Sequence, residues 1–258
     1  MNRFLTWFFS AAGVFGVPLG SWWCRRIEHL QTAERHERGL VLILPGVEGY
    51  GSVNLSIARG LEDGRFPGAV EIVDWTTGWF ALSLYHLRSR AIHDRGAVAI
   101  AERLQTYWAE YPDRPTFLIG HSGGGAVLLK ALEALPITSQ LTSAILLHVA
   151  VSPKYNFTNA LARVERSMWN YHSSYDLFQL GIGTLIFGTA DRRHCLAAGN
   201  RGFDVEKTDT DGEDRKLIQV PYRRSMIASG NLPGHCGCTN RLFVSEWIAP
   251  LIRACDRG

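Results

Sequence analysis

The stretch Thr116-Phe-Leu-Ile-Gly-His-Ser-Gly-Gly-Gly-Ala126 decides the fold of this 258-residue chain. It opens with a short apolar run, passes through a G-x-S-x-G pattern centred on Ser122, and continues into a helical pattern that Pro136 ends. A serine in a sharp turn between a strand and a helix presents its hydroxyl above the sheet, and only small neighbours fit such a strained turn. Gly120 and Gly124 meet this requirement, so we expect Ser122 to be a nucleophile.

A glycine-rich turn before a helix is also typical of phosphate-binding loops. The lysine of a P-loop does not follow here, and the spacing differs from the G-x-G-x-x-G of dinucleotide-binding proteins. A nucleotide-binding function is therefore disfavoured. The net charge of +3, without a long basic run, also gives no indication of a nucleic-acid partner.

Apolar runs and helical patterns alternate along the rest of the chain. Runs typical of buried strands occur at Leu40–Leu44, Ala69–Val73, Thr116–Ile119, Ser143–Val151, Met168–Tyr171 and Leu217–Val220. Helical patterns occupy Val53–Leu61, Ala81–Tyr111, Gly124–Leu135 and Arg241–Ala254, with a kink expected at Pro250. This alternation predicts an α/β fold whose mainly parallel β-sheet is flanked by helices on both faces, over residues 40–258. In such sheets, ligands bind beyond the carboxyl ends of the strands.

The form Gly-His-Ser-x-Gly-Gly at residues 120–125 resembles the nucleophile turn of lipases and esterases in the α/β-hydrolase superfamily. The resemblance implies the α/β-hydrolase fold, a serine nucleophile at Ser122, and catalytic partners in the chain order serine, acid, histidine. It is specific at this turn and covers residues 40–254 only in outline.

His235 is the predicted general base. The histidines that follow Ser122 are His148, His172, His194 and His235. Among them only His235 follows the last predicted strand, in the loop before the final helix, which is where the resemblance places the base. His148 lies within an apolar run and is interpreted as a core residue, whereas a simple surface-loop role remains the alternative for His235.

Asp176 is the predicted acid that orients the base, because it follows the predicted strand before the last one after a short turn. Asp191 is the alternative. The oxyanion hole needs backbone N–H donors from the residue after the nucleophile, Gly123, and from the loop after an early strand. Val47 is the preferred donor in that loop and Gly46 the alternative, since Pro45-Gly46 departs from the His-Gly that the family often has there.

Together these residues predict a serine hydrolase that cleaves a carboxylic ester through a covalent acyl-serine intermediate, without a cofactor or metal. Acyltransferase, thioesterase or peptidase chemistry would use the same residues, and a non-catalytic binding protein of the same fold is a further alternative. The expected substrate is a small-molecule ester or a lipid. The aromatics of Asp74-Trp-Thr-Thr-Gly-Trp-Phe80 either line an acyl site or pack against the next helix.

The N-terminus carries an uncharged stretch from Phe4 to Trp23, which predicts a membrane anchor or a secretory signal segment over residues 1–24 and a linker over residues 25–39. A buried apolar helix is the third possibility. We therefore expect a membrane-associated or exported protein. The five cysteines leave at least one thiol unpaired within the chain, and the C-x-C spacing of Cys236 and Cys238 is weak evidence for zinc.

Overall fold

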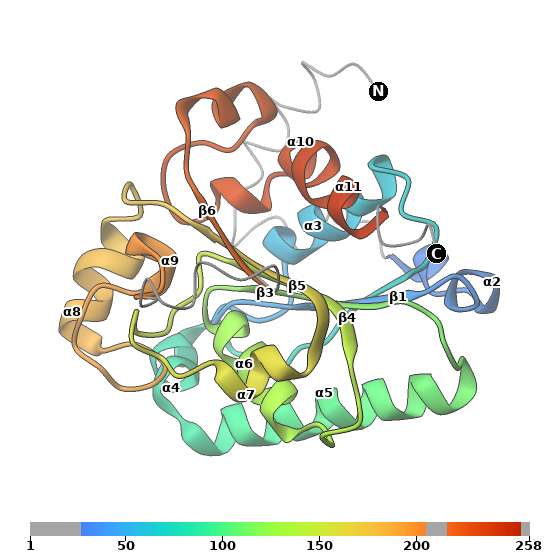
Figure 1. The fold of residues 1–258 in the computed structure, drawn as a ribbon. Helices are drawn as coiled ribbons and strands as arrows, with labels where there is room; N and C mark the ends of the chain where they lie inside the picture. Colours follow the sequence, from blue (N-terminus) through green and yellow to red (C-terminus); the bar gives the residue numbers. More distant parts are fainter. Residues whose placement is uncertain (1–26, 205–215, 254–258) are drawn as a thin grey trace.

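The computed structural model of this protein describes residues 27–204 and 216–253. Within them a single sheet of six parallel strands has the order β2-β1-β3-β4-β5-β6. The strands are β1 (Leu40–Leu44), β2 (Ala69–Ile72), β3 (Thr116–His121), β4 (Leu141–Leu147), β5 (Val164–His172) and β6 (Leu217–Pro221). Helices cover both faces of this sheet (Figure 1). The predicted fold class is thereby confirmed for the described part of the chain.

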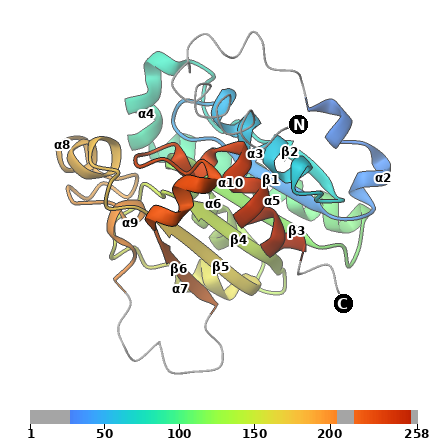
Figure 2. The same cartoon turned by 90° about the horizontal axis from the view of Figure 1, so that it is seen from above.

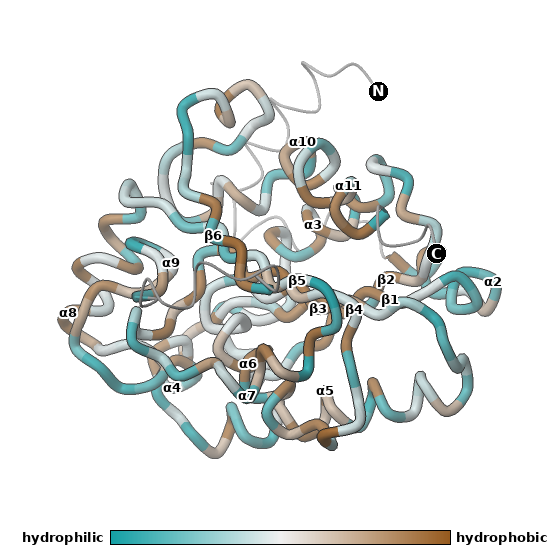
Figure 3. Tube along the Cα trace, viewed as in Figure 1, coloured by the Kyte–Doolittle hydropathy of each residue, from teal (hydrophilic) through white to brown (hydrophobic). Residues whose placement is uncertain are grey.

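The side chains of β1 show how both faces become buried. Leu40, Leu42 and Leu44 pack in one core cluster with α5 (Arg90–Glu110) and α6 (Gly123–Ala134). Val41 and Ile43 point the other way, into a second cluster with α3 (Ser52–Asp63) and the C-terminal helices. Because successive side chains of a strand alternate between faces, an unbroken apolar run fits a strand that is covered on both sides. Hydrophobic residues accordingly run along the central strands in Figure 3.

The C-terminal helical region is divided where its sequence requires it. It consists of α10 (Arg241–Phe243), a π-helical segment η8 (Val244–Ile248) and α11 (Ala249–Arg253). Pro250 has no N–H to donate within the helix, and the wider π turn ends at Ile248, two residues before it. The expected disturbance at Pro250 thus takes the form of a wide turn, and the region still packs against α3.

The helical pattern expected over Ala81–Tyr111 is interrupted. The 3₁₀ helix η3 (Phe80–Leu82) and α4 (Ser83–Arg88) end before Ser89, whose backbone is extended. The hydroxyl of Ser89 then accepts a hydrogen bond from the N–H of Ile92 at 3.4 Å and begins α5. A serine N-cap therefore starts a new helix in the middle of the continuous pattern.

Shorter elements complete the described residues. They are η2 (Glu28–Leu30), α2 (Ala33–His36), α7 (Thr158–Ala162), η4 (Phe178–Gly183), α8 (Thr184–Phe187), α9 (Ala198–Arg201), η6 (Arg224–Ser229) and η7 (Gly237–Thr239). The part of the expected linker that is described contains η2 and α2, and its Ile27 and Leu30 are buried in the second core cluster. The predicted N-terminal segment 1–24 lies outside the described residues and stays a prediction. Among the described helices, none combines the length and the apolar character needed to cross a bilayer.

All six strands point their carboxyl ends to the same edge of the sheet, because every neighbouring pair is parallel. The twist of the sheet and the loops gathered at this edge are visible from above in Figure 2. The strand β4 ends at Leu147 and not at Val151 as expected, since the backbone of His148 adopts a positive φ of 48°. His148 therefore belongs to the edge where ligands bind in parallel sheets.

Candidate active site

Ser122 occupies a strained turn between β3 and α6. Its backbone dihedral angles are φ 52° and ψ −120°, a combination that non-glycine residues rarely adopt. A Cβ atom on Gly124 would lie 2.2 Å from the carbonyl oxygen of Pro45 and 2.3 Å from that of Leu44. One on Gly120 would lie 2.7 Å from the Cα of Gly125. The two glycines of the motif are thus required because backbone segments approach each other directly at this turn.

Hydrogen bonds hold the turn in place. The N–H of Ser122 donates to the carbonyl of Leu147 at 3.0 Å, and the carbonyl of Ser122 accepts from the N–H groups of Gly125 and Ala150, each at 3.1 Å. Such bonds offset the cost of the strained backbone. The residue is 6% exposed, so the turn is packed against the sheet while Ser122 keeps some access to solvent.

His235 and Asp176 meet at the same edge. Nδ1 of His235 lies 2.5 Å from Oδ2 of Asp176, whose carboxylate is completely buried. Burial by itself would raise the pKa of Asp176, but the charge of His235 and hydrogen bonds from two histidines hold it far below its usual range. Burial would likewise lower the pKa of His235, yet Asp176 outweighs it and raises that pKa above 6.5. An ionised Asp176 therefore favours the protonated form of His235.

His235 contacts His121, the residue that directly precedes Ser122. The rings of His121 and His235 lie 4.8 Å apart between centroids, and Nε2 of His121 is 3.3 Å from the backbone oxygen of His235. Ser122 and His235, both described, form no hydrogen bond with each other in this structure. Catalytic hydrogen bonds are often long without substrate and tighten when it binds.

Sequence reasoning missed the part that His148 plays here. Expected as a core residue, it is buried, but its Nδ1 lies 3.2 Å from Oδ2 of Asp176. The oxygen that contacts His235 therefore contacts a second histidine as well. The signal that could have found it is its place directly after a strand, which an apolar run extending to Val151 concealed.

Asp191, the alternative acid, lies elsewhere and is fully engaged. Its carboxylate accepts hydrogen bonds from the N–H of Ser152 at 2.8 Å, from the hydroxyl of Ser152 at 2.5 Å and from the hydroxyl of Thr189 at 2.5 Å. These contacts connect two loops, and no contact with His235 is recorded. The arrangement of Asp191 is that of a structural carboxylate.

The loop after β1 lies directly against the start of α6. A Cβ atom on Gly123 would lie 2.8 Å from Cγ1 of Val47. The N–H of Val47 has no acceptor among the described residues, and Gly123 begins α6, where the first N–H groups lack partners within the helix. The N–H of Gly46, by contrast, donates to Oε1 of Glu48 at 3.2 Å. Glu48 is therefore turned inward, with Oε1 3.8 Å from Nδ1 of His121.

Two residues from distant parts of the chain hold this loop. The indole N–H of Trp75 donates to the carbonyl of Pro45 at 2.7 Å, and Nδ1 of His86 lies 2.8 Å from the carbonyl oxygen of Val47. The ring of Trp75 is only 3% exposed and packs edge-on against His93. Of the two roles expected for the aromatics of residues 74–80, Trp75 has the packing role. Trp79, in contrast, is 72% exposed.

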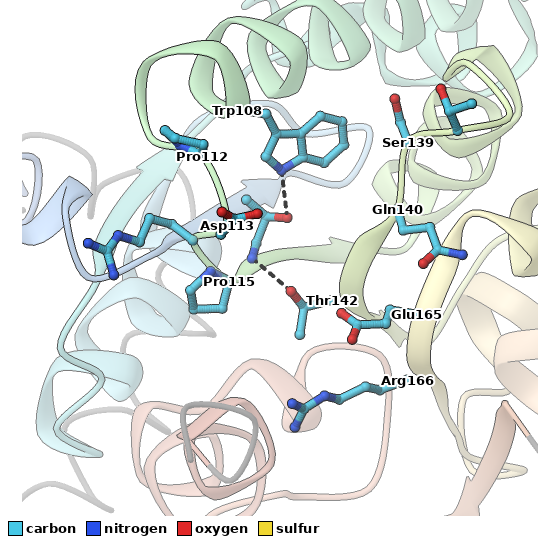
Figure 4. Close-up of a pocket in the computed structure, with 12 residues that line it drawn as sticks. Trp108, Pro112, Asp113, Pro115, Ser139, Gln140, Thr142, Glu165 and Arg166 are labelled. Atoms are coloured by element: carbon cyan, nitrogen blue, oxygen red, sulfur yellow. Dashed lines mark hydrogen bonds between the residues drawn. The ribbon is translucent and has the colours of Figure 1, made fainter. Parts of the chain in front are cut away.

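One hollow in the described structure lies away from these residues. It has a volume of about 670 Å³ and is lined by residues at the amino ends of β3, β4 and β5, such as Trp108, Thr142 and Glu165 (Figure 4). Two hydrogen bonds line this hollow. Trp108 Nε1 donates to Thr116 Oγ1 at 3.1 Å, and the N–H of Thr116 donates to Thr142 Oγ1 at 3.0 Å, so both join neighbouring parts of the fold. Ligand sites of parallel sheets lie at the opposite edge, so this hollow is not the candidate site.

His148, Asp176 and His235 are also the kind of cluster that binds metals, since their ligand atoms all lie within 4.8 Å of one another. Two ligands of one tetrahedral zinc ion, each about 2.0–2.2 Å from it, would be about 3.3 Å apart. The 2.5 Å separation of His235 Nδ1 and Asp176 Oδ2 is a hydrogen-bond distance instead. Hydrogen bonds therefore connect the three side chains in this arrangement.

Comparisons with known proteins give distant similarities. No protein-family model matches the chain, and no curated protein sequence matches it. Among solved structures, it is similar to a poly(3-hydroxybutyrate) depolymerase from Bordetella parapertussis, at 15% identity and a TM-score of 0.47, with 87% of this chain and 86% of that one covered. It is also similar to a Trichoderma reesei cutinase, at 10% identity and a TM-score of 0.41, with 84% and 76% covered. A cutinase-like protein from a Cryptococcus species gives 11% identity and a TM-score of 0.41, with 86% and 94% covered.

The geometry of this chain defines its structural class. A parallel sheet carries a glycine-flanked serine in a strained turn after β3, and an aspartate and a histidine follow in that chain order and pair at the same edge. These are the features of the α/β-hydrolase fold.

Proposed function

We propose that this protein is a serine hydrolase that cleaves carboxylic esters through a covalent acyl-serine intermediate. Ser122 is the nucleophile, His235 the general base, and Asp176 the acid that orients His235. The N–H groups of Val47 and Gly123 form the oxyanion hole. The observation that carries the proposal is the buried contact of 2.5 Å between Asp176 and His235, at the edge where the strained turn of Ser122 lies.

The reaction follows from these positions. Nδ1 of His235 is held by Asp176, which leaves Nε2 to accept the proton of Ser122 as its oxygen attacks the acyl carbon. The carbonyl oxygen becomes an oxyanion, stabilised by the two backbone donors. Collapse of this intermediate releases the alcohol, which takes its proton from His235. A water molecule then attacks the acyl-serine, with His235 again as base. Collapse of this second intermediate breaks the bond between the acyl carbon and the serine oxygen, releases the carboxylic acid, and returns the proton from His235 to Ser122.

The oxyanion hole is supported by the contacts around Val47. Gly46, the alternative donor, is engaged by Glu48, whereas the N–H of Val47 has no acceptor among the described residues. Trp75 and His86 contact the carbonyl groups of Pro45 and Val47 in the same loop. A donor fixed before substrate arrives costs little reorganisation during the reaction, which is where such groups gain their effect.

Exposed apolar side chains support a hydrophobic ester as substrate. They occur in the two segments that follow β2 and β5, namely Trp79, Phe80, Leu82, Leu84 and Tyr85 in the first and Leu177, Phe178, Ile182, Leu185, Ile186 and Phe187 in the second. The side chain of Arg88 donates to the carbonyl of Phe187 and connects the segments. The second segment starts directly after Asp176. Exposed apolar side chains that gather beside a pair of polar reacting groups are suited to contact with an apolar substrate.

A fluorophosphonate probe tests the nucleophile. The parent protein should become covalently labelled, and Ser122→Ala should abolish labelling. Ser139→Ala, at the amino edge of the sheet, is the matched control and should label like the parent. Labelling that persists in Ser122→Ala would refute the assignment of Ser122.

A panel of p-nitrophenyl esters of increasing acyl length, with thioester and amide controls, tests the substrate class. We expect ester hydrolysis with a preference for longer acyl chains. Faster turnover of the thioester or amide would favour a thioesterase or peptidase. Acyl transfer to an added alcohol in preference to water would favour an acyltransferase.

A further inference from the structure

His148 is a buried histidine for which the proposed reaction has no role. It directly follows β4, is 2% exposed, and has a φ of 48°. A non-glycine residue in this conformation costs of order 1 kcal/mol and persists where its surroundings demand it. Its one recorded side-chain hydrogen bond goes to Oδ2 of Asp176, at 3.2 Å. The turn therefore places an imidazole against the acid of the proposed triad.

The direction of this hydrogen bond follows from charge. Burial lowers the pKa of His148, and the opposing influence of Asp176 does not restore it, so the ring is neutral at neutral pH. The ionised carboxylate of Asp176 only accepts. The proton of the neutral ring must then sit on Nδ1, and His148 is the donor.

The carboxylate of Asp176 is thereby held from several sides. Oδ2 accepts from His148 and from His235, while Oδ1 accepts from the N–H of Leu180 at 3.2 Å. The backbone carbonyl of Asp176 accepts from Nδ2 of Asn200 at 2.9 Å. With three donors on its two oxygens and no exposed surface, the carboxylate has one orientation in which all its partners are satisfied.

We propose that His148 is a positioning residue, whose Nδ1–H fixes Oδ2 of Asp176 against His235 and takes up part of the negative charge of that oxygen. The inference rests on the proposed function of Asp176 and His235. It gives the buried acid two histidines with different tasks: His235 exchanges protons with the reacting groups, and His148 keeps its proton.

The consequence for His235 has a definite sign. A donor on Oδ2 disperses the charge that stabilises the protonated ring of His235, so removing the donor should raise the pKa of His235 further. Besides Asp176 and His148, the groups around His235 are Glu48, His121, Cys238 and its chain neighbour Cys236. Those that face His148 are Asp176, His121 and His235. None of these groups is changed by a substitution at position 148.

Two substitutions of similar shape distinguish the effect of the hydrogen-bond donor of His148 from the effect of its packing. His148→Asn places an amide N–H near the position of Nδ1 and tolerates a positive φ, whereas His148→Leu branches at the same atom but cannot donate. His148→Gly also lacks the donor and has no strain at this φ, so it serves if the Leu variant does not fold. Active-site titration with the fluorophosphonate probe normalises each preparation.

We expect His148→Asn to keep kcat within about 3-fold of the parent, and the Leu or Gly variant to lose roughly 10- to 100-fold in kcat at unchanged KM. In the Leu or Gly variant the acid limb of the kcat/KM profile should move to higher pH. Equal losses in the Asn and Leu variants, or a donor-free variant with parental kcat and pH profile, would overturn the inference.

Titration of the His235 ring by NMR gives an answer that needs no turnover. The pKa of His235 should rise in the donor-free variant and stay at its parental value in His148→Asn. An unchanged value in the donor-free variant would overturn the role of His148 even in an active enzyme. A parent protein that neither labels at Ser122 nor hydrolyses any ester would instead refute the proposed function.

Discussion

Gly124→Ala is the substitution whose effect follows most directly from the geometry of the serine turn. The added Cβ would lie 2.2 Å from Pro45 O and 2.3 Å from Leu44 O, where ordinary contacts begin at 3.4 Å. Both oxygens belong to the backbone, so neither can rotate away. The start of α6 and the loop after β1 must separate by about 1 Å, which carries Val47 away from Gly123. A misplacement of this size costs up to about 100-fold in rate, and overpacking costs about 1–3 kcal/mol of stability.

The assay compares kcat/KM for a p-nitrophenyl ester, normalised by active-site titration, with urea unfolding of the same preparations. Gly51→Ala is the matched control, because a Cβ there meets no atom within 4 Å. Its kcat/KM should stay within about 2-fold of the parent. A Gly124→Ala enzyme with kcat/KM within 3-fold of the parent would refute the argument that this close approach positions the oxyanion donor.

Three further predictions follow from single contacts. Asp176→Asn should lower kcat by about 10⁴-fold, whereas Asp191→Asn should lower the unfolding free energy by about 1–3 kcal/mol and keep kcat; the reverse pattern in kinetics and urea unfolding would make Asp191 the acid. Trp75→Phe removes the donor to Pro45 O and should reduce kcat several-fold with KM unchanged, and a parental kcat would show that the loop is held without it. His235 must be neutral to accept a proton, and its pKa is raised, so kcat/KM should increase with pH through a value above 6.5; a limb below 6.5 would contradict the Asp176 contact.

Much of the fold was predictable because the strands of a covered parallel sheet are apolar throughout. The bounds of β1 agree with the prediction at both ends. The predicted strand over residues 143–151 was too long for a physical reason. Residues 149–151 are buried and apolar, like a strand of the sheet, although they lie beyond the turn at His148. Nothing in the local sequence indicates the positive φ of His148, and its role near Asp176 was hidden for that reason.

The residues of the candidate site could be predicted from the sequence where their order along the chain restricts the choice. They could not be predicted where contacts between distant segments determine their role. The order of Ser122, Asp176 and His235 along the chain suggested their meeting at one edge. The engagement of Asp191 by Ser152 and Thr189 is visible only in three dimensions. So are the contacts of Trp75 and His86 with the loop after β1, since they join segments 30 and 39 residues apart.

Trapping the acyl-enzyme tests the central claim most directly. The protein is mixed with a p-nitrophenyl ester, quenched in acid within the first turnover, and analysed by intact mass and peptide mapping. We predict a mass increase equal to the acyl group, located on the peptide that contains Ser122 and absent from Ser122→Ala. An acyl group on another residue, or turnover of the ester without any covalent intermediate, would contradict the account.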